Sequence, residues 1–197
     1  MTATNSLVLR VPFLLVLLRL VFAPVMVIVG FRYGTEAGRF LATLVVLGVL
    51  TDVFDGIIAR RLGVATPALR RFDSQTDACF WLATLWTCWL LHPDAIVAEW
   101  PKLLAILLVE ASIYLLAYMK FGREMSTHSW LSKLWGLALT LAFTRLIAFG
   151  VTGWSFDLMV VVGLVSQLEV IAIALILPRW RNDVPTAWHA WRLRRGR

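Results

Sequence analysis

The sequence predicts an all-α integral membrane protein with six transmembrane helices. Hydrophobic residues make up 60% of the 197 residues and charged residues only 16%, and the mean hydropathy is +0.79. A soluble domain is about half apolar and about a quarter charged. At about 30 residues for each span with its loop, the length leaves room for roughly six membrane helices and little else. The composition therefore excludes a soluble globular enzyme, a disordered tail and a secreted disulfide scaffold.

Six apolar stretches are long enough to cross a hydrocarbon core of about 30 Å as helices. The first contains Arg19 and is too long for the apolar part of a signal peptide, so we expect it to be a retained span. We find no internal repeat or linker, and expect one domain over residues 1–197 with a basic, surface-lying tail at 178–197. The six stretches are Val11–Phe31, Ala37–Ile58, Phe72–Leu91, Trp100–Met119, Trp130–Gly150 and Phe156–Leu177.

The distribution of Lys and Arg beside the stretches predicts the orientation, because basic residues concentrate on the cytoplasmic side. One side has only Arg32, Arg39 and Lys102. The other has most of the basic residues, so we expect both termini to be cytoplasmic and the protein to lie in the inner or plasma membrane. This excess borders apolar spans, where it sets topology and meets anionic lipid, so we do not expect nucleic-acid binding. The basic side holds Arg10, Arg60, Arg61, Arg70, Arg71, Lys120, Arg123, Lys133, Arg179, Arg181, Arg192, Arg194, Arg195 and Arg197.

Four of the 12 acidic residues lie where the second and third stretches face each other across one loop. Asp52 and Asp55 are spaced i, i+3, and Asp73 and Asp77 are spaced i, i+4, so each pair shares one face of its helix. The loop folds the two helices back as neighbours. We therefore expect the four carboxylates to converge at the cytoplasmic ends of helices two and three.

Two interpretations of the acidic cluster remain open. The carboxylates could pair with nearby arginines or be solvated at the interface, or they could hold a divalent metal. Oxygen ligands without nearby Cys or His favour Mg²⁺ or Mn²⁺ over Zn²⁺. Gly56 and Ala59 indicate either close helix packing or the close approach of a ligand, and Arg60 supplies a planar cation suited to a phosphate.

The segment from Asp52 to Asp77 resembles the signature of the CDP-alcohol phosphatidyltransferase family, D-x-x-D-G-x-x-A-R-(x)8-G-x-x-x-D-x-x-x-D. Leu69 stands where the signature has its second glycine. The first span resembles the family's Pro-Asn-…-Arg-…-Pro opening more weakly, with Phe13 in place of Asn. The residues that match are Asp52, Asp55, Gly56, Ala59, Arg60, Asp73 and Asp77 in the signature, and Pro12, Arg19 and Pro24 in the opening.

The resemblance implies transfer of a phosphatidyl or similar substituted phosphate group from a CDP-linked lipid, such as CDP-diacylglycerol, to an alcohol, with release of CMP in phospholipid biosynthesis. It further implies a homodimer and two Mg²⁺ or Mn²⁺ ions about 4 Å apart. By the family pattern, Asp77 would be the general base. The metal ligands would be Asp52, Asp55, Asp73 and Asp77, and the CDP-binding residues would be Asp52, Gly56, Ala59 and Arg60.

Three further residues each have two possible roles. Lys133 and His128 would bind the acceptor, or else Lys133 pairs with a carboxylate and His128 is an interfacial polar residue. Arg19, deep in the first span, would either brace the helix bundle or reach the acidic site. Rival functions are a divalent-cation transporter or channel, and a non-catalytic membrane scaffold with a degenerate motif. A transporter would place its acids near the bilayer midplane in matching halves of a repeat.

Overall fold

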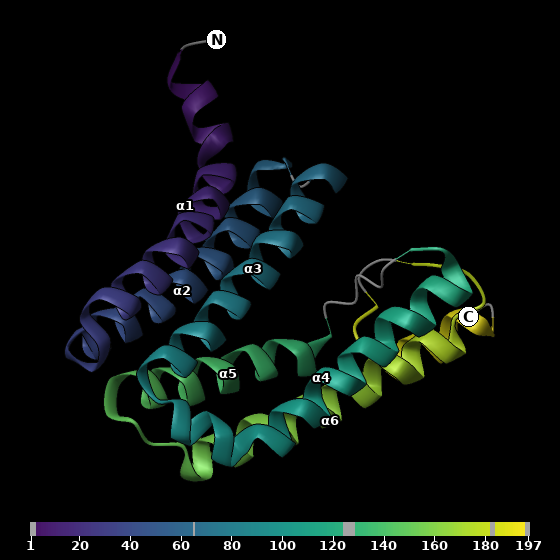
Figure 1. Ribbon diagram of the computed structural model, residues 1–197. Helices are drawn as coiled ribbons and strands as arrows, with labels where there is room; N and C mark the ends of the chain where they lie inside the picture. The colour runs from purple at the N-terminus through teal and green to yellow at the C-terminus, as the bar shows by residue number, and fades with distance from the viewer. Residues whose placement is uncertain (1–2, 65, 124–128, 182–183, 196–197) are drawn as a thin grey trace. The chain divides into compact units, whose positions relative to one another are not determined.

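The computed structural model describes residues 3–64, 66–123, 129–181 and 184–195. Within them the regular structure is helical, which confirms the all-α prediction, and each of the six predicted stretches coincides with a long helix (Figure 1). The short 3-10 helix η1 (Gly34–Ala37) joins the first two, and a short helix α7 (Ala187–Arg194) lies in the basic tail. The long helices are α1 (Ala3–Tyr33), α2 (Gly38–Leu62), α3 (Pro67–Leu91), α4 (Pro93–Phe121), α5 (Trp130–Phe149) and α6 (Gly153–Ile176).

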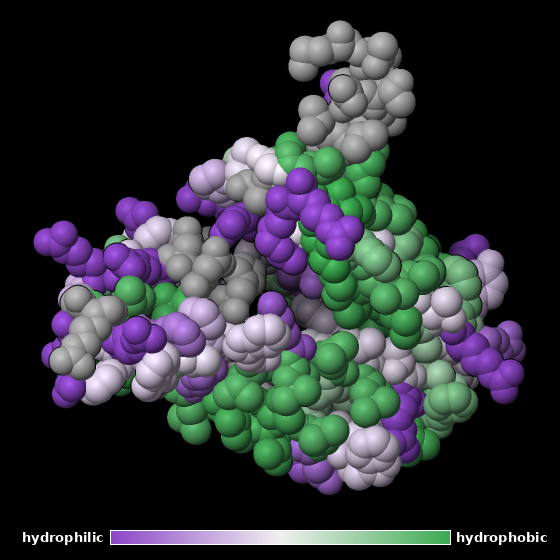
Figure 2. Space-filling view, turned by 180° about the vertical axis from the view of Figure 1, so that it is seen from behind, coloured by the Kyte–Doolittle hydropathy of each residue, from purple (hydrophilic) through white to green (hydrophobic). Residues whose placement is uncertain are grey.

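Four segments of the described chain are long and apolar enough to cross a membrane, and they indicate a multi-pass membrane protein. The longest contains both α1 and α2, which are separated only by η1 and pack against each other. Large hydrophobic side chains such as Phe31 and Met119 are exposed, and broad areas of the visible face are hydrophobic (Figure 2). Lipid-facing helices are expected to have such surfaces. The segments are Arg10–Leu62, Pro93–Phe121, Trp130–Phe149 and Gly153–Ile176.

Helix α3 does not belong to these apolar segments of the described chain, although its position agrees with the predicted third stretch. Its first half contains Arg70, Arg71, Asp73 and Asp77. These charges lower the mean hydropathy of any window long enough to span a membrane. Helix α3, which carries Asp73 and Asp77 of the acidic cluster, is therefore the least apolar of the long helices.

The chain divides into two compact units, residues 1–96 with 143–151 and residues 97–142 with 152–197. In the first unit, α1 packs along both α2 and α3, whereas α2 and α3 contact each other much less (Figure 1). Small residues allow these close approaches. Gly30 on α1 lies against Thr87 and Leu91 of α3. A side chain on α1 can therefore reach residues of α2 and α3 at the same time.

The turn between α2 and α3 is shorter than the sequence predicts, because both helices extend beyond the predicted limits at Ile58 and Phe72. Gly63 ends α2 in the left-handed conformation, with φ of 67°, and the N–H of Val64 donates to Ala59 O at 3.0 Å. This is the hydrogen-bond pattern of a Schellman motif. Thr66 caps α3, and its side chain accepts a hydrogen bond from the N–H of Leu69 at 3.2 Å. The aspartates consequently lie inside regular helix.

The second unit is built on α4 and α6, which run in the same direction. Polar contacts join them in the same order along both helices. Lys102 Nζ lies 2.6 Å from Asp157 Oδ1, Gln167 Nε2 donates to Glu110 Oε2 at 2.8 Å, and Lys120 Nζ donates to Ala174 O at 2.8 Å.

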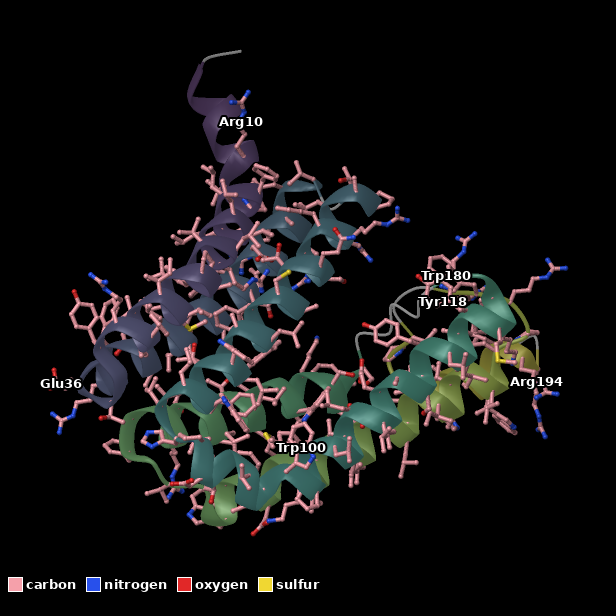
Figure 3. The ribbon with its side chains drawn as sticks, in the orientation of Figure 1. Arg10, Glu36, Trp100, Tyr118, Trp180 and Arg194 are labelled. Carbon is pink, nitrogen blue, oxygen red and sulfur yellow. The ribbon has the colours of Figure 1, made fainter. Side chains whose placement is uncertain are left out.

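Helix α7 packs against the end of α6 through a small hydrophobic core of Ile173, Leu177, Val184 and Ala190. Figure 3 labels charged side chains at the ends of the first unit and aromatic and charged side chains towards the ends of the second. In the second unit, Trp100 lies towards one end of α4, and Tyr118, Trp180 and Arg194 lie towards the other. In the first unit, Arg10 and Glu36 lie at opposite ends of the helices. Trp and Tyr favour membrane–water interfaces.

Candidate functional site

Helices α2 and α3 bring the predicted aspartates together in the first unit. Asp52 and Asp55 project from α2, and Asp73 and Asp77 project from α3. Oxygen atoms of Asp52, Asp55 and Asp73 all lie within 4.8 Å of one another. The Asp55 side chain is only 6% exposed, whereas that of Asp52 is 42% exposed. The cluster therefore has a buried side and a side open to a ligand.

Arg19 from α1 lies at the centre of the four carboxylates. Its Nη1 lies 2.5 Å from Asp52 Oδ1 and 2.6 Å from Asp77 Oδ1. Its Nη2 lies 3.2 Å from Asp55 Oδ2 and also donates a hydrogen bond to Asp73 Oδ1. The Arg19 side chain is 1% exposed. The sequence left two roles open for Arg19, and the structure places it in the acidic site.

The packing of α1 explains this geometry. Because α1 lies against both α2 and α3, a long side chain on its inner face can reach both pairs of aspartates. Met26 and Val16 share this buried face with Arg19. A lone arginine within an apolar span is expected to have an ionic partner, but that expectation does not specify which partner.

The charge of the cluster leaves room for a divalent cation. Four carboxylates and one guanidinium carry a formal charge of −3, the sum of −4 and +1. Two like charges 4 Å apart repel by about 4 kcal/mol at an effective dielectric constant of about 20. The compact group of three offers only carboxylate oxygens, which suit hard cations such as Mg²⁺ and Mn²⁺. The residues present therefore fit a divalent metal.

The small residues of α2 border this cluster. Gly56 follows Asp52 by one helical turn, and a Cβ added there would meet the Arg60 guanidinium, with Nη1 at 3.2 Å. Only the end of a flexible, exposed side chain therefore covers Gly56. Ala59 follows Asp55 by one turn and is buried. Asp52, Gly56 and Arg60 thus share one accessible face of α2, as their i, i+4 spacing requires.

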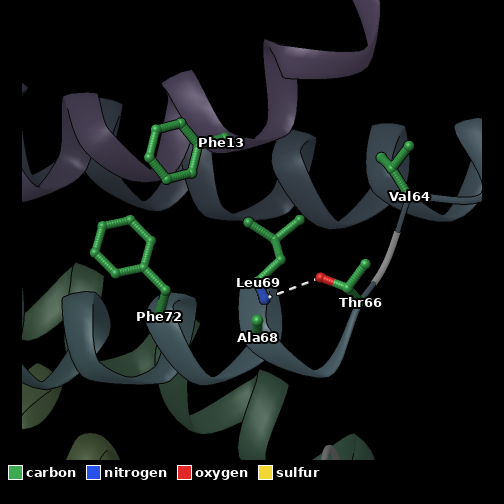
Figure 4. Close-up of a pocket in the computed structure, with 6 residues that line it drawn as sticks. All are labelled: Phe13, Val64, Thr66, Ala68, Leu69 and Phe72. Carbon is green, nitrogen blue, oxygen red and sulfur yellow. Dashed lines mark hydrogen bonds between the residues drawn. The ribbon is translucent and has the colours of Figure 1, made fainter.

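A cavity of about 420 Å³ lies beside the turn between α2 and α3 (Figure 4). The rings of Phe13 and Phe72, which both line it, stack on each other with centroids 5.5 Å apart, and Leu69 points towards α1. Phe13 and Leu69 are the two positions at which the chain departs from the family pattern. The structure shows that both line one cavity, whose walls are Phe13, Val64, Thr66, Ala68, Leu69 and Phe72.

The residues predicted to bind the acceptor belong to the second unit or lie outside the described residues. Lys133 is exposed on the first turn of α5, and its Nζ lies 4.8 Å from the centroid of the Trp130 ring. His128 lies outside the described residues. Nearby Ser129 is buried, and its hydroxyl lies 2.9 Å from that of Ser132. Of the two aromatic residues that line the cavity, the sequence singled out Phe13 but not Phe72, which has no special signal beyond its position before Asp73.

The fold and the site together define a class of protein, an integral-membrane protein with a buried acidic site suited to divalent metal. Residues 9–177 match the profile of the CDP-alcohol phosphatidyltransferase family. The chain belongs to this family. Neither a curated protein nor a solved structure matches it significantly.

Members of the family transfer a substituted phosphate group from a CDP-alcohol to an acceptor. The protein is therefore a metal-dependent transferase of phospholipid synthesis, and the aspartate cluster of α2 and α3 agrees with a metal site. This assignment favours the transferase over the cation transporter and the non-catalytic scaffold. The family match covers both departures from the pattern, Phe13 and Leu69.

Proposed function

We propose that the protein transfers a phosphatidyl group from a CDP-linked lipid such as CDP-diacylglycerol to an alcohol and releases CMP. The observation that carries this proposal is the convergence of Asp52, Asp55 and Asp73 within 4.8 Å on the family's signature helices. A lipid donor agrees with an acidic site on helices whose neighbours are long and apolar. The acyl chains of such a donor stay in the bilayer while its diphosphate reaches the interface.

The proposed topology has six membrane helices, with both termini and the acidic site on the cytoplasmic side. The basic residues beside the turn between α2 and α3, such as Arg60, Arg61 and Arg71, support this orientation through their positive charge. Each of α1 and α2 is long enough to cross the membrane by itself. The family resemblance also supports a homodimer.

In the proposed reaction Asp52, Asp55 and Asp73 would hold two Mg²⁺ or Mn²⁺ ions, and Asp77 would complete the cluster. When bound, the ions would neutralise the donor diphosphate and the leaving CMP. Gly56 and Ala59 present small surfaces for the cytidine and its phosphates. Arg60 supplies an exposed guanidinium for the phosphates.

Asp77 is the proposed general base. It reaches the cluster through Arg19, and its partly exposed carboxylate can accept the proton of the acceptor hydroxyl. The acceptor oxygen then forms a bond to phosphorus, while the bond from phosphorus to the CMP oxygen breaks and CMP leaves with its electron pair. The proposed acceptor ligands are Lys133 and His128, because cationic groups suit a phosphorylated or polyol alcohol.

The test is CMP release by the purified full-length protein from CDP-diacylglycerol with Mn²⁺ or Mg²⁺. The alcohols to compare are glycerol 3-phosphate, inositol phosphate, serine, diacylglycerol and phosphatidylglycerol. Asp73→Asn should lower turnover by more than about 100-fold, since even outer-shell partners of a metal contribute about 10–100-fold. Asp157→Asn is a matched control, because Asp157 is also an ion-paired carboxylate but lies on α6. Undiminished turnover in Asp73→Asn would remove the proposed role of Asp73.

A further inference from the structure

The guanidinium of Arg19 joins α2 and α3 through both of its terminal nitrogens. Nη1 contacts Asp52 of α2 and Asp77 of α3. Nη2 contacts Asp55 of α2 and Asp73 of α3. Each nitrogen therefore bridges the two helices, which have few direct contacts of their own at the backbone level.

The chemistry of this arrangement depends on the planar shape of the guanidinium. Arginine presents several N–H donors in a rigid fork and keeps its charge at all ordinary pH values. A compact ammonium has three donors on one atom and could not match four carboxylates placed around two nitrogens. The 1% exposure of Arg19 means that water screens its ion pairs little.

The carboxylates that pair with Arg19 include those that a divalent ion would use. Asp52, Asp55 and Asp73 form the compact group suited to a cation, and each of the three is already paired with Arg19. A divalent ion bound by these carboxylates would share them with the guanidinium or displace it. Two positive charges this close would also repel each other.

We propose that the positive charge of Arg19 has two opposing effects on the acidic cluster. It holds the four carboxylates together when no metal is bound, and it competes with the divalent ion for their oxygens. The competition with metal rests on the proposed function, whereas the bridge between α2 and α3 does not. Arg19 is a positioning residue in this scheme, because it acts on the carboxylates rather than on the reacting atoms.

The experiment compares Arg19→Gln, Arg19→Lys and the wild type in detergent. Arg32→Gln is the matched control, because Arg32 is an exposed arginine on the same helix. Mn²⁺ binding is followed by electron paramagnetic resonance of the free ion, and thermal unfolding is measured with EDTA. Activity is not needed as a readout.

Arg19→Gln should bind Mn²⁺ at least about tenfold more tightly than the wild type, because one competing charge is gone. With EDTA, it should unfold at a lower temperature, because the four carboxylates lose their shared partner. Arg19→Lys should fall between the two in both measurements, since it keeps the charge but loses the fork. Arg32→Gln should match the wild type.

A second variant covers the case in which Arg19→Gln does not fold. Arg19→Gln/Asp55→Asn removes the cation together with the most buried carboxylate, so it should unfold at a higher temperature than Arg19→Gln or restore folding. Failure of this rescue would overturn the bridging role. Equal or weaker Mn²⁺ binding by Arg19→Gln or, if that variant is unfolded, by Arg19→Lys would overturn the competition.

The outcomes also separate this inference from the proposed function. If the wild type binds no Mn²⁺, the proposed metal site and the competition both fail, and the EDTA measurements still decide the bridging role. If the wild type binds Mn²⁺ and releases CMP but Arg19→Gln has unchanged Mn²⁺ affinity, only the competition fails.

Discussion

The charged side chains of the two units have different kinds of interaction partner. In the first unit a single buried cation, Arg19, is shared among four carboxylates. In the second unit Lys102 lies between Glu99 and Asp157, and Lys120 donates to two backbone carbonyls at the end of α6. These two lysines of the second unit thus have separate, local partners, whereas the four aspartates of the first unit share one buried guanidinium.

This contrast distinguishes ion pairs that contribute to the stability of the fold from charges that form a binding site. Exposed ion pairs such as Lys102–Asp157 contribute about 0–1 kcal/mol and tolerate change. A buried cluster with more negative than positive charge is costly unless another cation joins it. The excess of carboxylates around Arg19, rather than the presence of acidic residues as such, therefore identifies the site.

Metal removal tests the contrast with the largest expected effect. Treatment with EDTA should lower CMP release by more than about 100-fold, since the carboxylates of the first unit would lose their second cation. Added Mg²⁺ or Mn²⁺ should restore release, and Zn²⁺ should restore less because the ligands are oxygens only. EDTA saturated with Mn²⁺ beforehand is the control. Full turnover after exhaustive chelation would contradict a metal-dependent site.

Substitutions within the cluster distinguish a metal ligand from the general base. Asp77→Asn should lower kcat by about 10²–10⁴-fold, the usual contribution of general base catalysis. Its Mn²⁺ midpoint should rise less than that of Asp55→Asn, because Asp77 is the least tightly held of the four proposed ligands and Asp55 is a central one. The measurements are steady-state CMP release and Mn²⁺ titration. An Mn²⁺ midpoint raised as far as in Asp55→Asn would make Asp77 chiefly a ligand and contradict its role as the base.

The sequence was sufficient to predict the long helices and the meeting of the aspartates. Long apolar stretches determine helix positions because the bilayer requires internally satisfied backbone, and the spacings of Asp52–Asp55 and Asp73–Asp77 place each pair on one face. The short turn was also encoded, since Gly63, Thr66 and Pro67 are typical helix-ending and helix-starting residues. The predicted helices were too short at the end of α2 and at the start of α3.

The sequence alone did not determine the centre of the site, because it left two roles open for Arg19. Arg19 is distant in sequence from all four aspartates, and its partners follow from the packing of α1 against both α2 and α3. That packing depends on the surfaces of three helices at once, so no periodic pattern within one segment of the sequence reports it. The same reason applies to Phe13 and Leu69, whose shared cavity appears only when α1 meets the start of α3.

The cavity leads to a prediction whose expected effect on KM and on stability is of intermediate size. Leu69→Gly restores the small residue of the family pattern, so the KM for the CDP-linked donor should stay or fall by up to about threefold. Glycine in the first turn of α3 should lower stability by about 1 kcal/mol. A large rise in KM would instead make Leu69 an adapted contact with the substrate.

Phe13→Asn extends this test to the second departure from the pattern. Because Phe13 and Leu69 line the same cavity, the effects of Phe13→Asn and Leu69→Gly on stability should not add, with a coupling above about 0.5 kcal/mol. Thermal or chemical unfolding of the two single variants and the double variant measures this coupling. Additive effects would mean that the two side chains act independently despite the shared cavity.

The smallest expected effect comes from the second unit and completes the comparison. Asp157→Asn removes an exposed carboxylate that lies 2.6 Å from Lys102, and Lys102 keeps Glu99 as a partner at 2.7 Å. The free energy of unfolding should therefore fall by less than about 1 kcal/mol, and CMP release should equal that of the wild type. Asp73→Asn is the same chemical change in the first unit. If both variants lost activity equally, the loss would follow from removing any ion-paired carboxylate, and the distinction between the shared cluster and the local pairs would fail.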